Sequence, residues 1–344
     1  MAKVAINGLG RIGRATLKIV LDTPGLELVA ANELAPVDDV VYLLKHDTVY
    51  GRYERPVRAE DGVLAIGPDR VKLLHEKDPA RLPWQSLAID VVFECTGVFP
   101  RREDLVKHVQ AGAKFVILSA PSKSDDVETV VHGANTPDNG AAIISCASCT
   151  TNCITPVIEI LGRRIGVRKA TMTTVHAYTA SQHIVDAPHR HIRRGRAGAA
   201  NFVPTTTGAA AATTKALPEY RGRFNGIAVR GPVAVGSLAD IVVLTTRSTT
   251  VAEVNAAFSA EADSDRYRGI VGVTDEPLVS SDIIRDPRAS VIDLGMTQVV
   301  DGDLVKVLSW YDNEWGYSSQ MVREAQRIAA TIEGRTPKAT TARA

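Results

Sequence analysis

The stretch that decides the fold reads Val4-Ala5-Ile6-Asn7-Gly8-Leu9-Gly10-Arg11-Ile12-Gly13. A short apolar, β-like run leads at once into Gly-x-Gly-x-x-Gly, and apolar residues at helical spacing continue to Leu21. Pro24 and Gly25 end this helix, and residues 26–31 are expected to form a second strand. Because backbone N–H groups at such a helix N-terminus can hold a pyrophosphate, the stretch predicts a βαβ dinucleotide-binding unit.

The end of the second strand carries the acidic residue that such a unit requires. Glu33 lies 20 residues after Gly13, where its carboxylate can accept hydrogen bonds from the ribose diol. A carboxylate at this position would also repel the 2′-phosphate of NADP. NAD is therefore the predicted cofactor.

Strands and helices alternate through residues 1–148. Further buried strands are predicted at residues 89–95 and 115–119, with a helix at residues 102–111 between them. This alternation favours a parallel, doubly wound sheet.

The second half of the chain has a different pattern. Asp301-Gly302 is a hairpin-turn pair that favours antiparallel pairing, and Thr250-x-x-Glu253 opens a helix with a capping box. The strand candidates here are rich in Thr and Val: residues 169–175, 226–230, 240–246, 289–294 and 303–311. The predicted fold class is α/β: a Rossmann-type doubly wound NAD-binding domain over residues 1–148, and an α+β catalytic domain with a mainly antiparallel sheet over residues 149–312.

The charges of the chain are balanced. Its 40 Lys and Arg against 39 Asp and Glu give a net charge of +1, so neither nucleic acid nor a membrane is a predicted partner. The chain shows no N-terminal signal pattern, and no apolar run approaches the roughly 18 residues that span a bilayer. A cytoplasmic location is expected.

Cys149 is the candidate nucleophile. It lies just before a helix-like stretch at residues 153–161, and free N–H groups at a helix N-terminus stabilise a thiolate. His176 follows a Thr-rich strand, from which it can reach the sulfur and lower the thiol pKa further. A thiol beside a hydride acceptor suits an aldehyde substrate, because the thiolate adds to the carbonyl, hydride leaves to nicotinamide, and a thioester remains.

Cys146-x-x-Cys149 also matches half of a zinc or redox motif. Together with Cys153 it places three cysteines in one loop and helix start, which gives no second ligand pair. No metal site is predicted.

Five stretches carry a family resemblance, and they occur in family order over nearly the whole chain. They are Ala5-Ile6-Asn7-Gly8-Leu9-Gly10-Arg11-Ile12-Gly13-Arg14, Ala147-Ser148-Cys149-Thr150-Thr151-Asn152-Cys153, His176-Ala177-Tyr178-Thr179, Pro204-Thr205-Thr206-Thr207-Gly208-Ala209-Ala210 and Trp310-Tyr311-Asp312-Asn313-Glu314-Trp315-Gly316-Tyr317. With them the chain resembles the phosphorylating glyceraldehyde-3-phosphate dehydrogenases.

The resemblance implies the glycolytic reaction: NAD-dependent oxidation of glyceraldehyde 3-phosphate to 1,3-bisphosphoglycerate, with inorganic phosphate as the second substrate. It implies a homotetramer as well. It further implies that a C-terminal helix, residues 313–333, packs back on the NAD-binding domain. The remaining residues, 334–344, are expected to form a mobile tail.

The resemblance also implies a role at each matching position. Cys149 would be the nucleophile, and His176 its base and a donor to the developing oxyanion. Thr179 and Arg230 would hold the substrate's phosphate, and inorganic phosphate would be held by Ser148, Thr150, Arg194, Thr207 and Gly208. The cofactor would be lined by Gly8, Gly10, Arg11, Ile12, Gly13, Glu33, Lys77, Thr96 and Ser119, with Asn313 fixing the nicotinamide carboxamide and Tyr317 packing nearby.

Two other functions are possible. Erythrose-4-phosphate dehydrogenase uses the same cysteine and histidine, but it generally lacks the Thr179-type contact and the His-Ala-Tyr-Thr stretch. A non-enzymatic RNA-binding role would use the basic cluster from Arg190 to Arg196, which lacks interleaved aromatic residues. Thr179 and the His-Ala-Tyr-Thr stretch favour the three-carbon substrate, and the pair of Cys149 and His176 argues against RNA binding as the sole role.

Four positions depart from the family pattern. Glu33 stands where Asp is usual, Cys146 where Asn is common, and Ala180-Ser181 where Asn-Asp is usual. Residues 231–237 differ from the usual Val-Pro-Thr stretch after Arg230. These departures leave open the strength of the NAD preference, a redox role for Cys146, and the conformation of the two altered loops.

Overall fold

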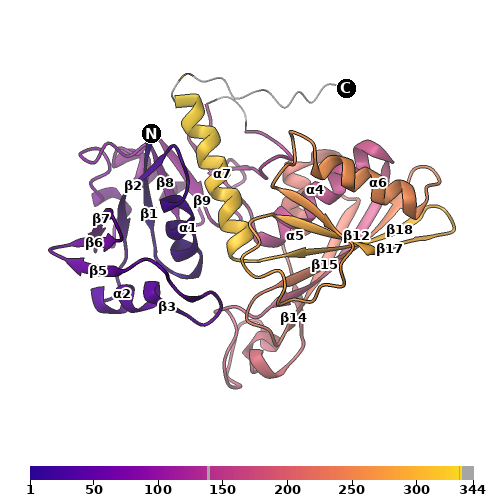
Figure 1. Ribbon diagram of the computed structural model, residues 1–344, viewed down its shortest axis with the longest axis horizontal. Helices are drawn as coiled ribbons and strands as arrows, with labels where there is room; N and C mark the ends of the chain where they lie inside the picture. Colours follow the sequence, from indigo (N-terminus) through magenta and orange to yellow (C-terminus); the bar gives the residue numbers. More distant parts are fainter. Residues whose placement is uncertain (138–139, 333, 335–344) are drawn as a thin grey trace. The chain divides into compact units, whose positions relative to one another are not determined.

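The computed structural model describes residues 1–137, 140–332 and 334 (Figure 1). The chain divides into two compact units. The first contains Met1–Val130, Pro137–Ala147 and the chain from Met321, and the second contains Val131–Thr136 and Ser148–Gln320. The domain limits given above stay a prediction. The expected mobile tail, residues 334–344, lies outside the described residues except for Gly334.

The first unit is built on a sheet in the order β10-β11-β9-β8-β1-β2-β7-β6-β5. Every pairing from β10 to β7 is parallel, and β7, β6 and β5 form an antiparallel edge. The strands are β1 Ala2–Asn7, β2 Leu26–Asn32, β5 Val57–Glu60, β6 Val63–Ile66, β7 Asp69–Leu74, β8 Val91–Glu94, β9 Phe115–Leu118, β10 Glu128–Thr129 and β11 Ile143–Ser145. β2 pairs with one edge of β1, whereas β8, which comes later in the chain, pairs with the other edge. The strand order therefore reverses between β1 and β8, and such a topological switch point is where sheets of this kind bind ligands.

Three helices accompany this sheet: α1 Arg11–Leu21, α2 Val37–Lys45 and α3 Arg102–Gln110. A two-stranded pair, β3 His46–Asp47 and β4 Gly51–Arg52, follows α2. The predicted strand, glycine turn, helix and strand at the N-terminus is therefore confirmed as β1, α1 and β2, and the predicted doubly wound sheet is confirmed with it.

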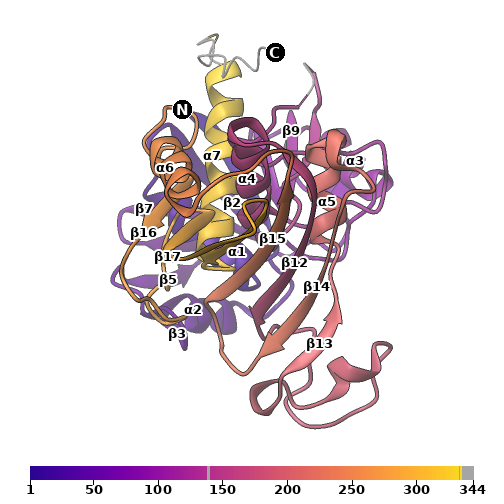
Figure 2. The ribbon, with the colours of Figure 1, turned by 90° about the vertical axis from the view of Figure 1, so that its right-hand side faces the viewer.

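The second unit is built on a sheet in the order β13-β14-β12-β15-β18-β17-β16 (Figure 2). Four of its pairings are antiparallel, and β12 with β14 and β16 with β17 are parallel. The strands are β12 Val167–Ala177, β13 Val203–Thr206, β14 Phe224–Gly231, β15 Ser237–Thr245, β16 Val271–Thr274, β17 Ser290–Val300 and β18 Leu304–Tyr311. The mainly antiparallel sheet expected from the sequence is confirmed.

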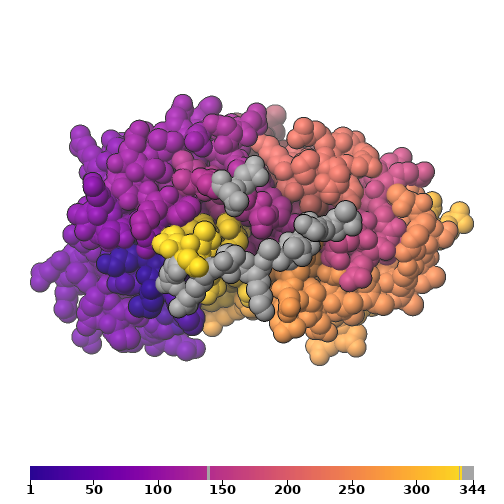
Figure 3. Space-filling view, turned by 90° about the horizontal axis from the view of Figure 1, so that it is seen from above, coloured from indigo at the N-terminus to yellow at the C-terminus, as the bar shows by residue number. Residues whose placement is uncertain are grey.

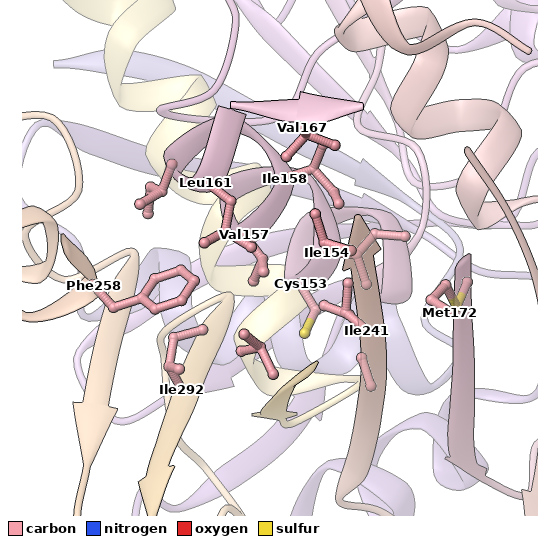
Figure 4. Close-up of a cluster of buried hydrophobic side chains, with 14 of the residues drawn as sticks. Cys153, Ile154, Val157, Ile158, Leu161, Val167, Met172, Ile241, Phe258 and Ile292 are labelled. Carbon is pink, nitrogen blue, oxygen red and sulfur yellow. The ribbon is translucent and has the colours of Figure 1, made fainter. Parts of the chain in front are cut away.

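Helices α4 Cys149–Arg164, α5 Ala209–Ala216 and α6 Val251–Ala262 pack on this sheet. Figure 4 shows the core that results, in which α4 presents Cys153, Ile154 and Val157 toward strand residues such as Ile241 and Ile292. All five side chains are fully buried. Burial of each of the four aliphatic ones stabilises the fold by roughly 1.5–3 kcal/mol. This core fixes the N-terminus of α4, and with it Cys149.

Local turn chemistry explains two further features of the second unit. Asp301 and Gly302, in the turn between β17 and β18, both have positive φ, 48° and 77°, a left-handed conformation that Asp and Gly adopt more readily than other residues. Thr250 caps α6 by accepting from the backbone N–H of Glu253 at 3.2 Å. The Glu253 carboxylate bonds to Arg247 and Thr249 instead, so one half of the predicted capping box is formed.

The last helix, α7 Trp315–Ile332, contributes residues to both units. In its second half, Gln326 Nε2 donates to Pro24 O at 3.2 Å, and both residues belong to the first unit. Figure 3 shows this yellow segment beside the indigo N-terminal residues. Among the described residues, no helix combines the length and apolar character needed to cross a membrane.

Candidate active site

Cys149 begins α4 and lies beside His176. Ser148 is the N-cap, and its Oγ accepts from the backbone N–H of Thr151 at 3.2 Å. The Cys149 Sγ lies 3.3 Å from His176 Nε2. The sulfur's residue is partly exposed, whereas His176 is 5% exposed. The structure therefore brings the two predicted catalytic residues together.

Arg230 completes this group because its strand pairs with that of His176. β12 and β14 run in parallel with His176 and Arg230 in register. Arg230 Nη1 lies 2.6 Å from His176 Nδ1 and donates to Ala177 O at 3.0 Å. His176 Nδ1 lies 2.7 Å from the same carbonyl oxygen, which can only accept. Nδ1 thus lies between Arg230 Nη1, which can only donate, and Ala177 O, which can only accept, while Nε2 faces the sulfur.

Burial and the Arg230 charge together lower the pKa of His176 to about 3, because both penalise a second positive charge on the ring. Burial also raises the pKa of the Cys149 thiol, although Arg230 and hydrogen bonds from Thr150 act in the opposite direction. The expectation of a lowered thiol pKa is wrong for this structure, since burial outweighs the helix N-terminus and its neighbours. His176 is therefore neutral at neutral pH.

Two supporting groups were missed from the sequence. Tyr311 Oη lies 2.9 Å from Thr150 Oγ1 and 2.8 Å from Thr174 Oγ1, and its ring meets that of His176 edge-on at 6.0 Å. Tyr311 stands inside a quoted family stretch, which was a signal that could have found it.

Ser237 is the second missed group. Its hydroxyl accepts from Ala177 N at 3.1 Å and donates to Asn313 Oδ1 at 2.9 Å. It thus ties Asn313 to the end of the strand that carries His176. No motif marked this serine, because it lies in the stretch that departs from the family pattern.

Replacing Tyr311 with phenylalanine is expected to destabilise the fold by about 1–3 kcal/mol and to lower kcat several-fold, because the buried hydroxyls of Thr150 and Thr174 lose a partner. Urea unfolding and steady-state kinetics measure the two effects. The matched control is Tyr267→Phe, since the buried Tyr267 hydroxyl bonds to Glu159 and not to the site. That control should lose stability but keep kcat; an equal loss of kcat in both variants would contradict the role given to Tyr311.

The residues predicted to bind the substrate's phosphate differ in how they are held. Thr179 is partly exposed, and its Oγ1 lies 2.9 Å from Ser181 Oγ, in the loop where Ala180-Ser181 departs from the usual Asn-Asp. Arg230 is partly buried, and its Nε has no hydrogen-bond partner among the described residues. An N–H donor left without an acceptor suits an anion.

The residues predicted to bind inorganic phosphate come from two loops and the start of α4. Arg194 Nε donates to Thr205 Oγ1 at 2.9 Å and Nη2 to Thr206 O at 3.1 Å, which places the guanidinium beside Thr207. Gly208 is the exposed N-cap of α5. Ser148 and Thr150 adjoin Cys149 directly. All of these lie in the second unit.

The glycine turn of the first unit fits a dinucleotide. Gly8 has φ of 93°, and a Cβ there would lie 2.8 Å from Thr96 N; a Cβ on Gly13 would collide with the Gly8 carbonyl. Gly10 caps α1 with no side-chain hydrogen bond, and no atom lies within 4 Å of where its Cβ would be. The turn packs tightly on the inside and is open at Gly10, as close approach of a pyrophosphate requires.

Glu33 lies against this turn. Its Oε2 accepts from Leu9 N at 2.7 Å, and its Oε1 accepts from Leu34 N at 2.7 Å and from Ala35 N at 3.1 Å. The carboxylate is half-exposed. The longer acid thus holds the glycine turn and its own loop; its bond to a ribose stays a prediction.

The other predicted cofactor residues are divided between the units. Arg11 forms a 2.6 Å ion pair with Asp47, Ile12 is half-buried, and Lys77 is exposed. Thr96 and Ser119 follow β8 and β9 at the carboxyl edge of the parallel strands. Asn313 and Tyr317 are buried and belong to the second unit, so their predicted contacts with the cofactor remain predictions.

The remaining cysteines show no sign of chemistry. All four are free thiols, and the described residues contain no group of three or more His, Cys, Asp and Glu that could hold a metal. Burial raises the pKa of Cys146 well above its ordinary value. Since the thiolate is the reactive form, this burial argues against a redox role for Cys146.

Comparison with known proteins gives two matches to family models. The NAD binding domain of glyceraldehyde 3-phosphate dehydrogenase matches residues 2–102, and the C-terminal domain of that enzyme matches residues 148–313. The two models together match most of the chain.

Curated relatives are similar over nearly the whole chain. A glyceraldehyde-3-phosphate dehydrogenase from Zymomonas mobilis is 44% identical over 96% of this chain and 99% of its own length. One from Streptomyces coelicolor is 45% identical over 93% and 96%, and glyceraldehyde-3-phosphate dehydrogenase 1 from Bacillus cereus is 45% identical over 94% and 97%. The chain belongs to the glyceraldehyde-3-phosphate dehydrogenase family.

Proposed function

We propose that this chain catalyses the NAD-dependent, phosphorylating oxidation of glyceraldehyde 3-phosphate to 1,3-bisphosphoglycerate through a thioester on Cys149. The observation that carries the proposal is the 3.3 Å approach of Cys149 Sγ to His176 Nε2 beside the Arg230 guanidinium. The names of the similar proteins support the substrate, and the matched NAD binding domain supports the cofactor.

Cys149 and the neutral imidazole of His176 can perform the first step together. As Sγ adds to the aldehyde carbon, His176 Nε2 accepts the thiol proton and returns it to the oxygen of the adduct. NAD, when bound, accepts the hydride. His176 then takes the hydroxyl proton as the carbonyl reforms, and Cys149 carries a thioester. A neutral imidazole is what both proton transfers need.

The second half of the reaction uses inorganic phosphate. A phosphate oxygen adds to the thioester carbon, the carbon–sulfur bond breaks, and the proton held by His176 returns to the sulfur. We assign inorganic phosphate to Ser148, Thr150, Arg194, Thr207 and Gly208, and the substrate's phosphate to Thr179 and Arg230. The unpartnered Nε of Arg230 and the position of Arg194 beside Thr207 support this assignment.

The proposal includes a homotetramer in the cytoplasm. Apolar side chains stand exposed on the outer face of the second sheet, among them Val175 at 41%, Ile227 at 52% and Met296 at 44%. Such an apolar surface favours association between subunits. Sedimentation equilibrium tests the homotetramer. A monomer would refute the proposed tetramer but not the proposed reaction.

The test of the reaction follows nicotinamide reduction with glyceraldehyde 3-phosphate, with and without inorganic phosphate, using NAD or NADP. Turnover should require NAD and phosphate together. Oxidation at an unchanged rate without phosphate would mean that the thioester is hydrolysed, and the phosphate site would be wrong. Erythrose 4-phosphate is the competing aldehyde; a higher kcat/KM with it would replace the proposed substrate.

Arg194→Leu is expected to raise the KM for inorganic phosphate by about tenfold or more, because a guanidinium contact to an anion is lost. The KM for NAD should not change. Arg193→Leu is the matched control, since Arg193 is an exposed neighbour. Steady-state kinetics at varied phosphate measure the effect, and equal KM values for the two variants would exclude Arg194 from the site.

A further inference from the structure

A chain of buried polar side chains runs beneath the glycine turn in the first unit. Trp84 Nε1 donates to His108 Nδ1 at 3.0 Å, and His108 Nε2 lies 3.1 Å from Glu94 Oε2. All three residues are fully buried. None of them takes part in the reaction described above.

The hydrogen bonds fix the protonation of this chain. The indole N–H can only donate, so His108 Nδ1 must accept, and the neutral ring carries its proton on Nε2, toward Glu94. Glu94 Oε2 also accepts from Asn7 Nδ2 at 2.6 Å, and Oε1 accepts from Thr96 N at 2.8 Å and from Thr96 Oγ1. Four donors therefore face the carboxylate, which is the pattern of an ionised acid.

Within the described residues, this carboxylate has no Lys or Arg partner. Its one ion-pair contact in the described part of the chain is with His108, which is neutral because Nδ1 accepts from Trp84. A buried anion held only by hydrogen bonds is costly.

The position of Glu94 links it to the cofactor's binding site. It ends β8 and pairs in register with Asn7 at the end of β1, on the two sides of the switch point. Through Oε1 it holds Thr96, and the Thr96 backbone is the surface against which Gly8 packs, 2.8 Å from where a Cβ of Gly8 would lie. A movement of Glu94 would therefore move the glycine turn.

We propose that Glu94, oriented by His108 and Trp84, is a positioning residue for the dinucleotide, and that its buried charge favours the oxidised form. It acts through Thr96 and the Gly8 turn and does not itself touch the reacting atoms. NADH carries one more negative charge than NAD⁺, so an uncompensated anion beneath the site disfavours NADH relative to NAD⁺. The proposal rests on NAD binding by the first unit.

The experiment measures the dissociation constants of NAD⁺ and NADH by calorimetry for wild type, Glu94→Gln, His108→Leu and His108→Gln. Glu94→Gln keeps the shape and removes the charge, so the ratio of the NADH constant to the NAD⁺ constant should fall about threefold or more. His108→Leu keeps the charge but loses both hydrogen bonds, and should weaken both nucleotides by a similar factor of about ten. His108→Gln can accept from Trp84 and donate to Glu94, and should restore binding.

An unchanged ratio in Glu94→Gln, or wild-type affinities in His108→Leu, would overturn the proposal. A purely structural role would weaken both nucleotides equally in Glu94→Gln. If Glu94→Gln does not fold, the two His108 variants decide. Tighter nucleotide binding by His108→Gln than by His108→Leu would support positioning through Trp84, His108 and Glu94, and equal binding by both variants would refute it. Because affinity and not turnover is measured, the proposal can fail while the function proposed above stands.

Discussion

Replacement of Cys149 by serine is expected to lower kcat roughly ten-thousandfold or more. A serine hydroxyl is far less acidic than a thiol and a poorer nucleophile, so its addition to the aldehyde carbon should be much slower. The affinity for NAD should remain, since the glycine turn belongs to the other unit. Nicotinamide absorbance measures the rate, and calorimetry measures the affinity.

Cys153→Ser is the matched control for this variant. Cys153 is fully buried on the same helix, and its Sγ lies 3.2 Å from Ser309 Oγ, so a hydroxyl fits the site. It should retain most of the wild-type turnover. Comparable activity in the Cys149 variant would show that the thioester is not on the pathway, whereas loss in both would point to damage to α4.

His176→Asn is expected to lower kcat by roughly a hundredfold to ten-thousandfold, because proton transfer to and from the substrate oxygen is lost. Steady-state rates at saturating NAD and phosphate measure it. His183→Asn serves as the control, since His183 is half-buried in the following loop and does not contact the sulfur. If the His176 variant kept its rate, the base would have to be another group.

The same variant should change the pH dependence of stability. In the unfolded chain a histidine binds a proton near pH 6.5, but in the folded protein the pKa of His176 is about 3. The unfolded state therefore binds more protons between these values, and the unfolding free energy falls as pH drops, by up to about 1.4 kcal/mol per unit. His176→Asn should lack this contribution below pH 6.5 and match wild type above it. Urea unfolding at several pH values measures the difference, and parallel curves would contradict the lowered pKa.

The elements that carry the site could be predicted because their patterns are local. The glycine turn follows from the spacing of Gly8, Gly10 and Gly13, and the long strands of the second sheet from their Thr and Val content. The antiparallel edge from β5 to β7 was missed, since its strands are short and their pairing depends on turns that the periodicity does not show.

The properties of the site depend on contacts between distant residues. Burial reverses the expected direction of the Cys149 pKa, and burial is decided by the packing of α4 on the second sheet. Tyr311 and Ser237 act through hydroxyls whose partners lie far along the chain. Glu94 was predicted only as part of a strand, because its partners Asn7 and His108 come from other elements.

The in-register pairing of His176 with Arg230 has a consequence for how the enzyme becomes active. A slip of one residue between β12 and β14 would turn one of these side chains to the opposite face of the sheet. A nascent chain therefore cannot bring Arg230 beside His176 before β12 and β14 align. Activity should therefore appear during refolding at the moment when this sheet forms. A chain with misaligned strands should be inactive, and should not show a low residual rate of aldehyde oxidation.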